Sequence, residues 1–297
     1  MHLDFLISFL LFLNLYECAP PCEQEYECPK DYQDVYSKKE ITQIPKTTRP
    51  NVREMFFVHT SISAIQSGSF QKMPALEKLF FISNEINTIE AGAFDNLQKL
   101  HELEVSSNTG LEKVKAGIFR NLEQLRKLIL KNNKISVIEK GVFDDLMSLE
   151  ELYLNVNEIS SLPDGIFYPL SNLTTLHLAR NKITALAKDS FINLNNLKVL
   201  RLYDNQLSDL PEGILESQSG LRELSLSQNR ITSLPATTLS HTPYLEKLFL
   251  DGNLIEELPN TFFFGLKFMK HLKINQNQLQ MLPAMVLHAS SYSFGPK

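Results

Sequence analysis

One asparagine recurs along the chain at an almost constant spacing, and this regularity limits the possible folds more than any other feature. Successive asparagines are about 24 residues apart, and only the interval from Asn108 to Asn133 is slightly longer. Thr60 lies one such interval before the first asparagine and marks a degenerate first unit. The chain therefore contains ten units, and a period of this length predicts an array of stacked structural repeats. The recurring asparagines are Asn84, Asn108, Asn133, Asn157, Asn181, Asn205, Asn229, Asn253 and Asn277.

Apolar residues recur at fixed positions around each asparagine. The clearest unit, residues 173–186, follows the pattern L-x-x-L-x-L-x-x-N-x-L-x-x-L. The second half of every unit adds a bulky apolar residue, which is phenylalanine in most units and leucine in the others. Coincident matches at one period predict a common apolar core that runs through all units. The bulky residues are Phe70, Phe94, Phe119, Phe143, Phe167, Phe191, Leu215, Leu239, Phe263 and Leu287.

The spacing of the leucines predicts the local structure of each unit. The central L-x-L alternation is typical of a short strand with both leucines on one side. Stacked units then form one parallel sheet with strands about 4.8 Å apart. Each asparagine ends a strand, and its amide can bond backbone groups of its own turn and of the adjacent unit. We therefore assign the asparagines a structural role and no ligand.

The turn opposite the sheet contains Leu-Pro in five units. Proline has no N–H for a ladder, so we expect the outer side to be irregular or single-turn helix rather than a second sheet. One inserted residue separates Asn108 from Leu111, and Gly110 lies there. We expect a local loop bulge at this point, not a domain break. The Leu-Pro pairs are Leu162-Pro163, Leu210-Pro211, Leu234-Pro235, Leu258-Pro259 and Leu282-Pro283.

Residues 1–19 are expected to be a signal peptide. Residues 5–15 are apolar except for Ser8 and Asn14, which suits a signal-peptide core and falls short of the roughly 20 apolar residues that span a bilayer. An uncleaved apolar end bound at an interface is the alternative. No later stretch is long enough to span a membrane. We therefore expect a secreted, extracellular protein with no membrane insertion of the mature chain.

All three cysteines, Cys18, Cys22 and Cys28, precede residue 30. Cleavage after Ala19 would leave Cys22 and Cys28, which we expect to form a disulfide that staples a small cap. A metal site would need four ligands, and no histidine neighbours this pair. Cleavage before Cys18 would instead leave an odd thiol. The expected organisation is a signal peptide at 1–19, an N-terminal cap at 20–51, ten repeats at 52–289, and a tail without a cysteine cap at 290–297.

Composition and motifs argue against catalysis and against nucleic-acid binding. The formal net charge is −5, so no basic excess calls for a nucleic acid. The seven histidines show no HExxH spacing, and His101-Glu102 lacks the second histidine. No G-x-S-x-G motif occurs, and the repeats contain no cysteine that could act as a nucleophile. We expect no catalytic residues, no metal and no cofactor, and the sequence leaves the oligomeric state open.

The residues between and beside the strand leucines should point onto the concave face of the sheet. The fold requires no particular side chains there, so large apolar or aromatic residues at these positions are informative. Two zones are candidates. The first is an apolar patch near the amino end, formed by Phe56, Val58, Phe80 and Ile82, and the second is a mixed patch in mid-array, formed by Tyr153, His177, Arg201 and Tyr203. The alternatives are that the cap folds over the first patch and that the second is an ordinary solvated face. The candidate partner-binding residues are Phe56, Phe80, Ile82, Tyr153, His177, Arg201, Tyr203 and Phe249.

Asn172 begins the single N-x-S/T sequon, Asn172-Leu173-Thr174. It precedes a predicted strand, where its side chain should reach solvent. Given secretion, we expect this asparagine to be glycosylated. The alternative is an unused sequon.

The repeat resembles the typical class of extracellular leucine-rich repeats, with the form L-x-x-L-x-L-x-x-N-x-L-x-x-L-P-x-G-x-F-x-x-L. The resemblance covers residues 52–289 and includes the turns at 164–167 and 212–215. It implies a horseshoe-shaped solenoid with a parallel sheet on its concave face. Within the class, residues 57–61 and 103–105 look most like the non-catalytic subunit of carboxypeptidase N. The usual carboxyl-terminal cysteine cap is absent from this sequence.

The resemblance implies a protein that binds another protein through its concave face and has no catalytic activity. Three functions fit this interpretation. The first is a carrier or regulatory subunit of an extracellular enzyme, as the carboxypeptidase N likeness implies. The second is a recognition ectodomain for immune or cell-surface signalling, and the third is an extracellular-matrix organiser. A common fold does not choose among them.

Overall fold

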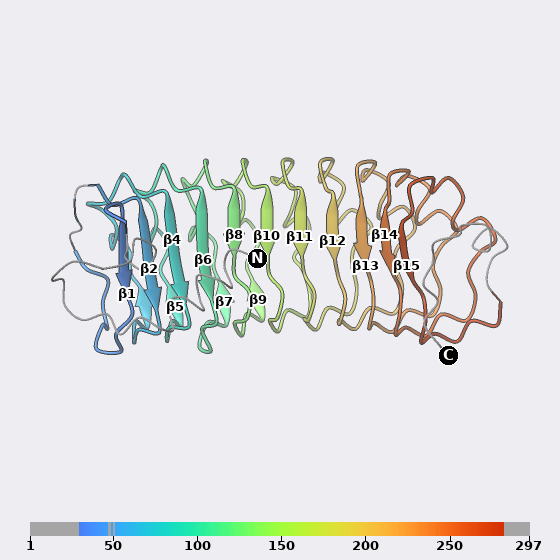
Figure 1. Ribbon diagram of the computed structural model, residues 1–297, viewed down its shortest axis with the longest axis horizontal. Helices are drawn as coiled ribbons and strands as arrows, with labels where there is room; N and C mark the ends of the chain where they lie inside the picture. The colour runs from blue at the N-terminus through green and yellow to red at the C-terminus, as the bar shows by residue number, and fades with distance from the viewer. Residues whose placement is uncertain (1–29, 47–48, 50, 282–297) are drawn as a thin grey trace.

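The units stack into one long parallel sheet whose strands follow each other in sequence order (Figure 1). The computed structural model describes residues 30–46, 49 and 51–281. Eleven strands form this sheet, and the predicted leucine-rich-repeat solenoid is confirmed. The strands are β1 (Gln33–Tyr36), β2 (Glu54–Val58), β4 (Lys78–Ile82), β6 (Glu102–Ser106), β8 (Lys127–Ile129), β10 (Glu151–Tyr153), β11 (Thr175–His177), β12 (Val199–Arg201), β13 (Glu223–Ser225), β14 (Lys247–Phe249) and β15 (His271–Lys273).

Side chains alternate across each strand as the L-x-L pattern predicts. In β6, Leu103 and Val105 are fully buried in the core, while Glu104 and Ser106 lie on the other face. The register keeps this alternation constant along the array, because Leu152 pairs with Leu176 and Leu176 with Leu200. A slip of one residue would move every leucine to the wrong face. The apolar spacing therefore fixes the register.

The recurring phenylalanines form a stack that runs through the core. From Phe70 to Phe191, each ring lies 6.0 to 6.4 Å from the next, measured between ring centroids. Rings at this distance have favourable offset contacts in addition to the area that they bury. Beyond Phe191 the position is taken by Leu215 and Leu239, which are also buried. The stack therefore links the first six units most strongly.

The asparagines form a ladder of hydrogen bonds beside the sheet. The Nδ2 of Asn157 donates to the carbonyl oxygens of Leu130 (2.9 Å) and Leu154 (3.0 Å), and its Oδ1 accepts from Ile135 N–H (3.0 Å). The same pattern repeats at Asn181, which is 8% exposed. Each amide satisfies backbone groups that water cannot reach, so it connects two successive units. The structural role predicted for the asparagines is confirmed.

The residue before each ladder asparagine has a positive φ. At Val156 the angle is 58°, and at Gly252 it is 68°. A left-handed residue turns the chain away from the strand, and this turn directs the next side chain inward. The polar residues that occupy most of these positions tolerate this conformation better than the β-branched Val156 does. The sharp turn, together with the asparagine, ends each strand.

The outer side differs from the prediction in the first half of the array. Two short parallel sheets form there, one between β3 (Ala64–Ile65) and β5 (Thr88–Ile89) and one between β7 (Lys113–Val114) and β9 (Val137–Ile138). These units have no proline in the outer turn, so their N–H groups are free to form a ladder. Where Leu-Pro occurs, the described chain forms only turns. The prediction that the outer side lacks a second sheet was therefore wrong for the early units and correct for the later ones.

The inserted residue near Gly110 changes the asparagine ladder locally and leaves the sheet continuous. Residues 109–110 form a turn, and β6 still pairs with β8. Asn133 Oδ1 accepts from the backbone N–H of Asn108 (2.8 Å), while the Oδ1 of Asn108 itself is buried without a partner. The expected local irregularity, without a domain break, is confirmed.

The amino-terminal part of the described chain adds a strand to the sheet. β1 pairs with β2 in parallel, and the ring of Tyr36 stacks on Phe57 at 5.0 Å. This contact covers the first core layer. The predicted signal peptide, the disulfide between Cys22 and Cys28, and the tail at 290–297 lie outside the described residues, as do Leu287 and the end of the last predicted unit after residue 281.

Two buried polar side chains, Gln218 and Thr242, interrupt the leucine layer at successive units. Gln218 is fully buried at a position that Leu170 and Leu194 occupy in the two preceding units. Its Nε2 donates to the carbonyl of Phe191 (2.7 Å), which already accepts a backbone bond from Leu194 (2.9 Å). Its Oε1 has no partner. The glutamine therefore supplies no bond that the backbone needs.

Substituting Gln218→Leu should stabilise the fold by about 1 kcal/mol, because it removes an unpartnered buried oxygen and adds apolar contacts. Urea unfolding followed by circular dichroism measures the free energy of unfolding. The reverse change at an equivalent position, Leu194→Gln, is the control and should lower it. A lower stability of the Gln218→Leu protein would contradict this account of the layer.

Candidate functional site

The concave face carries three rows of outward side chains. The strand pairings confirm the middle row that the leucine alternation predicts, with Tyr153 beside His177 and His177 beside Arg201. A second row lies two residues before the middle row in each strand, and none of its members was among the predicted binding residues. It follows from the same alternation, because every second residue of a strand faces the same way. Its members are Glu54, Lys78, Glu102, Lys127, Glu151, Thr175, Val199, Glu223, Lys247 and His271.

The missed row is a chain of alternating charges at the amino-terminal end. Lys78 Nζ lies 3.6 Å from Glu54 Oε1 and 3.8 Å from Glu102 Oε2, and Lys127 Nζ lies 3.1 Å from Glu102 Oε1. The lysine side chains are one-third exposed, so each pair contributes little to stability. The row sets a polar border along one side of the concave face.

The predicted apolar patch is present, but its side chains are buried rather than exposed. Phe56, Val58, Phe80 and Ile82 are between 2% and 5% exposed, and we call them the amino-terminal patch. The rings of Phe56 and Phe80 stack at 4.6 Å with planes only 5° apart. Rings on adjacent strands stand one strand spacing apart, so they cover each other's faces. The expectation that these side chains are exposed was therefore wrong.

The cap does not fold across this patch through its described strand. Val35 of β1 is in register with Phe56 and packs against the patch from the side. β1 therefore lengthens the sheet and extends the patch by one strand.

Four predicted residues come together in the middle of the array, and we call Tyr153, His177, Arg201 and Tyr203 the mid-array cluster. The ring centroids of Tyr153 and His177 are 6.0 Å apart, and those of His177 and Tyr203 are 5.7 Å apart in an edge-on arrangement. Arg201 Nε donates to Glu223 Oε1 at 2.7 Å. Tyr153, Arg201 and Tyr203 are half-buried, whereas His177 is 7% exposed. These side chains have fixed positions and leave part of each surface available.

The electrostatics of the cluster follow from burial and from neighbouring charges. Burial, with a smaller effect of the Arg201 charge, lowers the pKa of His177 to about 4. Burial and a hydrogen bond from the Tyr153 hydroxyl to Glu151 Oε2 (2.7 Å) raise the pKa of Tyr153. Burial alone would raise the pKa of Glu223, but Arg201 outweighs it and the net shift is downward. At neutral pH the cluster therefore presents a neutral imidazole beside an ion pair.

Phe249 does not join the mid-array cluster. It is half-buried in β14, in register with Ser225 on one side and Lys273 on the other. The Lys273 ammonium lies 5.6 Å from the centre of its ring, within range of a cation–π contact. Ser225 separates Phe249 from Arg201 in the middle row, so this position forms a separate contact point.

Asn172 lies away from the concave face, in the exposed loop before β11. Its Nδ2 donates to the carbonyl oxygen of Met147 at 2.8 Å. A glycosylated amide retains one N–H, so this hydrogen bond and a glycan are compatible. The predicted exposure of the side chain is confirmed.

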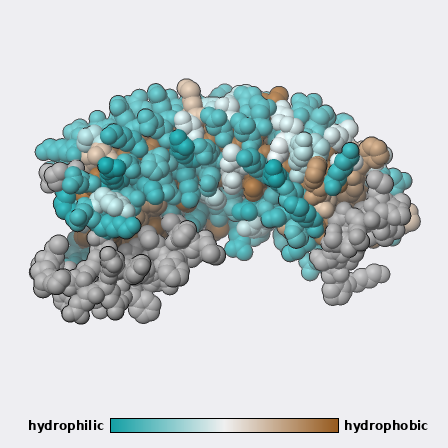
Figure 2. All heavy atoms as spheres, turned by 45° about the horizontal axis from the view of Figure 1, so that its top comes forward, coloured by the Kyte–Doolittle hydropathy of each residue, from teal (hydrophilic) through white to brown (hydrophobic). Residues whose placement is uncertain are grey.

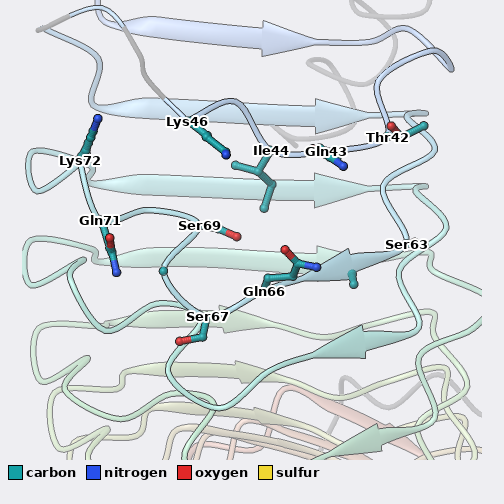
Figure 3. Close-up of a pocket in the computed structure, with 12 residues that line it drawn as sticks. Thr42, Gln43, Ile44, Lys46, Ser63, Gln66, Ser67, Ser69, Gln71 and Lys72 are labelled. Carbon is teal, nitrogen blue, oxygen red and sulfur yellow. The ribbon is translucent and has the colours of Figure 1, made fainter.

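A polar groove of about 480 Å³ lies outside the predicted site, between residues 42–46 and the first outer turn at 63–72. Figure 3 shows Ile44 and Lys46 on one side of it and Gln66, Ser67 and Ser69 on the other. Its lining includes no histidine, cysteine, aspartate or glutamate. The side chains that most often ligate metals are therefore not found among these lining residues, although the lining includes Lys46 and Lys72.

Within the described ranges, no three His, Cys, Asp or Glu side chains are grouped closely enough to hold a metal ion. The same residues contain no helix that is long and apolar enough to cross a bilayer. Most of the side chains visible in Figure 2 are hydrophilic, with small apolar areas between them.

Comparison with known families agrees with this architecture. Residues 37–149 and 63–198 match the family described as BspA type leucine-rich repeat region, and residues 195–255 match a second leucine-rich-repeat family. These matches span more than half of the chain. The chain belongs to the leucine-rich-repeat proteins. Proteins of this family in general mediate protein binding, and neither match indicates a catalytic family.

Solved leucine-rich-repeat structures resemble this one. A chain from the octameric complex of latrophilin 3, Unc5D and FLRT2 (LRR) has a TM-score of 0.67 and 26% identity, covering 76% of this chain and 68% of that one. A leucine-rich-repeat protein of Leptospira interrogans has a TM-score of 0.62 and 28% identity, covering 85% and 69%. A chain of the Drosophila Toll–Spätzle complex, at 0.64 and 21%, covers 76% and 35% and shows the fold alone.

No curated protein sequence matches the chain. The family and structure matches support a leucine-rich-repeat protein and do not distinguish the carboxypeptidase N branch from the others.

The low pKa of His177 predicts a pH-dependent stability. The unfolded chain takes up a proton near pH 6.5, whereas the folded chain does so only near pH 4. Stability should therefore fall as the pH drops from 6.5 to 4, by at most about 3 kcal/mol. Substituting His177→Gln should remove this part of the pH dependence in urea unfolding series. His241→Gln, at an exposed histidine, is the control, and an unchanged slope in the His177 variant would contradict the assignment.

Proposed function

We propose that this leucine-rich-repeat protein is a secreted, non-catalytic binding module that holds a protein partner on its concave face. The mid-array cluster is the observation that carries the proposal. Its tyrosine and arginine side chains lie on the strand face opposite the core, so the fold does not need them. Tyrosine and arginine are enriched among the residues that dominate binding at protein interfaces.

The geometry of the cluster supports specific binding. Tyr153 projects from the unit of β10, and Arg201 and Tyr203 project from the unit of β12, two units further along a rigid sheet, so little conformational freedom is lost when a partner binds. The Arg201–Glu223 pair fixes the guanidinium, and the neutral His177 packs between the two tyrosine rings without adding charge. A partner surface with apolar groups and an acceptor for the remaining Arg201 N–H groups fits this arrangement.

Three further observations favour a binding role outside the cell. The apolar run at 5–15 has the character of a signal peptide, and the cysteines at 22 and 28 suit a disulfide in an oxidising compartment. The similar chain in the latrophilin 3, Unc5D and FLRT2 complex belongs to an assembly of several proteins. Secretion, the disulfide and the absence of catalysis are parts of this proposal.

Replacing Tyr153, Arg201 and Tyr203 by alanine together should weaken partner binding at least about 100-fold, because each anchor contributes of the order of 1–2 kcal/mol. The partner is first captured from the native fluid with the full chain and identified by mass spectrometry. Affinity is then measured by surface plasmon resonance, with folding checked by circular dichroism.

The matched control replaces Tyr168, Arg222 and Tyr244, which have the same residue types and lie outside the three concave rows. Their loss should leave the affinity unchanged. If both triple variants bind the partner with equal affinity, the mid-array cluster is not part of the binding site.

The identity of the captured partner separates three functions. A carboxypeptidase would indicate the carrier or regulatory subunit that the sequence resemblance implies. A cell-surface receptor or ligand would indicate a recognition ectodomain, and collagen would indicate a matrix organiser. The similarity to a chain from the latrophilin 3, Unc5D and FLRT2 complex favours recognition over the other two.

We also propose that Asn172 carries an N-linked glycan. The protein expressed in a secretory cell should show a mass excess that peptide N-glycosidase F removes. Substituting Asn172→Gln should abolish the excess, while Asn196→Gln, at an asparagine outside any sequon, should retain it. A wild-type mass equal to that of the unmodified chain would refute the modification.

A further inference from the structure

The outer sheet of the first units has an open edge at β3. Within the described residues, β3 pairs with β5 and with no other strand. The carbonyl oxygen of Ser63 accepts a bond from Asn87 N–H at 2.9 Å, on the β5 side. The carbonyl oxygen of Ile65 accepts one from Glu90 N–H, also at 2.9 Å. Successive residues of a strand direct their backbone groups to opposite edges, so the N–H and C=O of Ala64 point away from β5.

The polar groove of about 480 Å³ lies along this open edge. Ala64 and Gln66 are among the residues that line it, and residues 42–46 form its opposite wall (Figure 3). One hydrogen bond joins the two walls, from Ser61 N–H to the carbonyl oxygen of Ile41 (3.0 Å). Beyond that bond, residues 42–46 and 63–66 form no backbone hydrogen bond with each other. The groove is therefore open where a further strand would pair with β3.

The groove exists because its amino-terminal wall does not complete the outer sheet. Ile41 and Ile44 are partly buried and pack against the core. Pro45 follows them and has no N–H for a ladder. The segment therefore passes beside β3 without pairing, and the edge of β3 stays available to another chain.

The side chains around the groove favour an acidic ligand. Lys46 and Lys72 line it and are exposed, and the lining contains no aspartate or glutamate. Within the described ranges, neither ammonium group forms an ion pair with a carboxylate. Glu90 is engaged elsewhere, because its Oε2 accepts from Ser67 N–H at 2.9 Å. Most other lining side chains are serine, threonine or glutamine, which can donate to carboxylates.

We propose that β3 and this groove bind an extended, acidic segment of a protein partner, which adds a strand beside Ala64. The backbone of the segment pairs with the N–H and C=O of Ala64, and its aspartate or glutamate side chains meet Lys46 and Lys72. The inference goes beyond the proposed function, because the groove lies beside the first outer turn and not on the concave face. It does not depend on the mid-array cluster.

An extended peptide fits this place better than a compact ligand does. An open sheet edge presents a donor and an acceptor in the spacing of a ladder, which is the arrangement that strand addition uses. The groove volume of about 480 Å³ falls within the range of roughly 300–1,000 Å³ that ligand sites have. Hydrogen bonds between a lysine and a carboxylate are about twice as strong as neutral ones, so the two lysines favour an acidic segment over a neutral one.

A phage library of random 12-residue peptides tests the inference on the full chain. Peptides are selected on the wild type and counter-selected on Ala64→Pro, which removes the outward N–H. An edge strand tolerates proline where the N–H faces away from the ladder, so the variant should keep the circular dichroism spectrum of the wild type. Lys113→Pro, at the equivalent register position of β7, is the matched control and should bind the peptides like the wild type.

The recovered peptides should be enriched in aspartate and glutamate. Recovery of no peptide that distinguishes Ala64→Pro from the wild type would overturn the inference. Peptides without an acidic preference would overturn it as well.

Charge reversal tests the lysines without changing the backbone. For a synthetic copy of a selected peptide, Lys46→Glu combined with Lys72→Glu should weaken binding at least tenfold. Lys115→Glu combined with Lys140→Glu, at two exposed lysines outside the groove, should leave binding unchanged. Equal affinity of the two double variants would contradict the role of the groove.

Chemical change of the peptide gives a readout that does not involve the stability of the protein. A strand that pairs along one edge uses only every second N–H group. N-methylation of one set of alternate amides should therefore abolish binding, and N-methylation of the other set should be tolerated. Equal effects of the two sets would show that no strand is added.

The triple alanine variant of Tyr153, Arg201 and Tyr203 separates this inference from the proposed function. It should bind the peptide like the wild type, because the groove lies outside the concave face. Loss of peptide binding in that variant would place the peptide on the concave face, which would overturn the inference and leave the proposed function intact.

Discussion

The asparagine amide is the contact on which the array depends. In each later unit, its Nδ2 donates to carbonyl groups of two successive units, and its Oδ1 accepts a backbone N–H, as at Asn205 and Asn229. A side chain that satisfies three backbone groups lets the chain turn sharply at the end of every strand while remaining buried. The leucines and phenylalanines can then pack in register, and the sheet continues from unit to unit without a partner domain.

Because of this division of roles, the fold places few constraints on which side chains point outward from the concave face. The core needs the inward leucines and the ladder needs the asparagines, whereas the outward rows can hold any residue that a strand tolerates. The mid-array cluster and Glu104 use that freedom in different ways. The cluster is internally satisfied, with Arg201 on Glu223 and Tyr153 on Glu151, whereas Glu104 keeps one oxygen without a partner.

Much of the fold could be predicted from the sequence, because its interactions repeat at one spacing. The asparagine positions indicated the unit boundaries, and the L-x-L alternation predicted the strands and their faces. The short outer sheets were missed because the proline argument was applied to all units, although Ile65 and Ile89 stand in units whose outer turn lacks proline. The middle-row residues lie on the concave face as the alternation predicted, but the charged row with Glu223 and Lys247 was not considered as part of the candidate site.

The sequence by itself determined the repeat, the direction of each side chain and the kinds of residue on the concave face. These properties depend on neighbours within one unit, which periodicity reveals. Only the tertiary structure decided how deeply each side chain lies and what it touches. Phe56 is covered by Phe80, and Arg201 meets Glu223, although the two members of each pair belong to different repeat units. The low pKa of His177 and the free oxygen of Glu104 arise from such cross-strand contacts, because burial and electrostatics depend on distances in space rather than on spacing along the sequence.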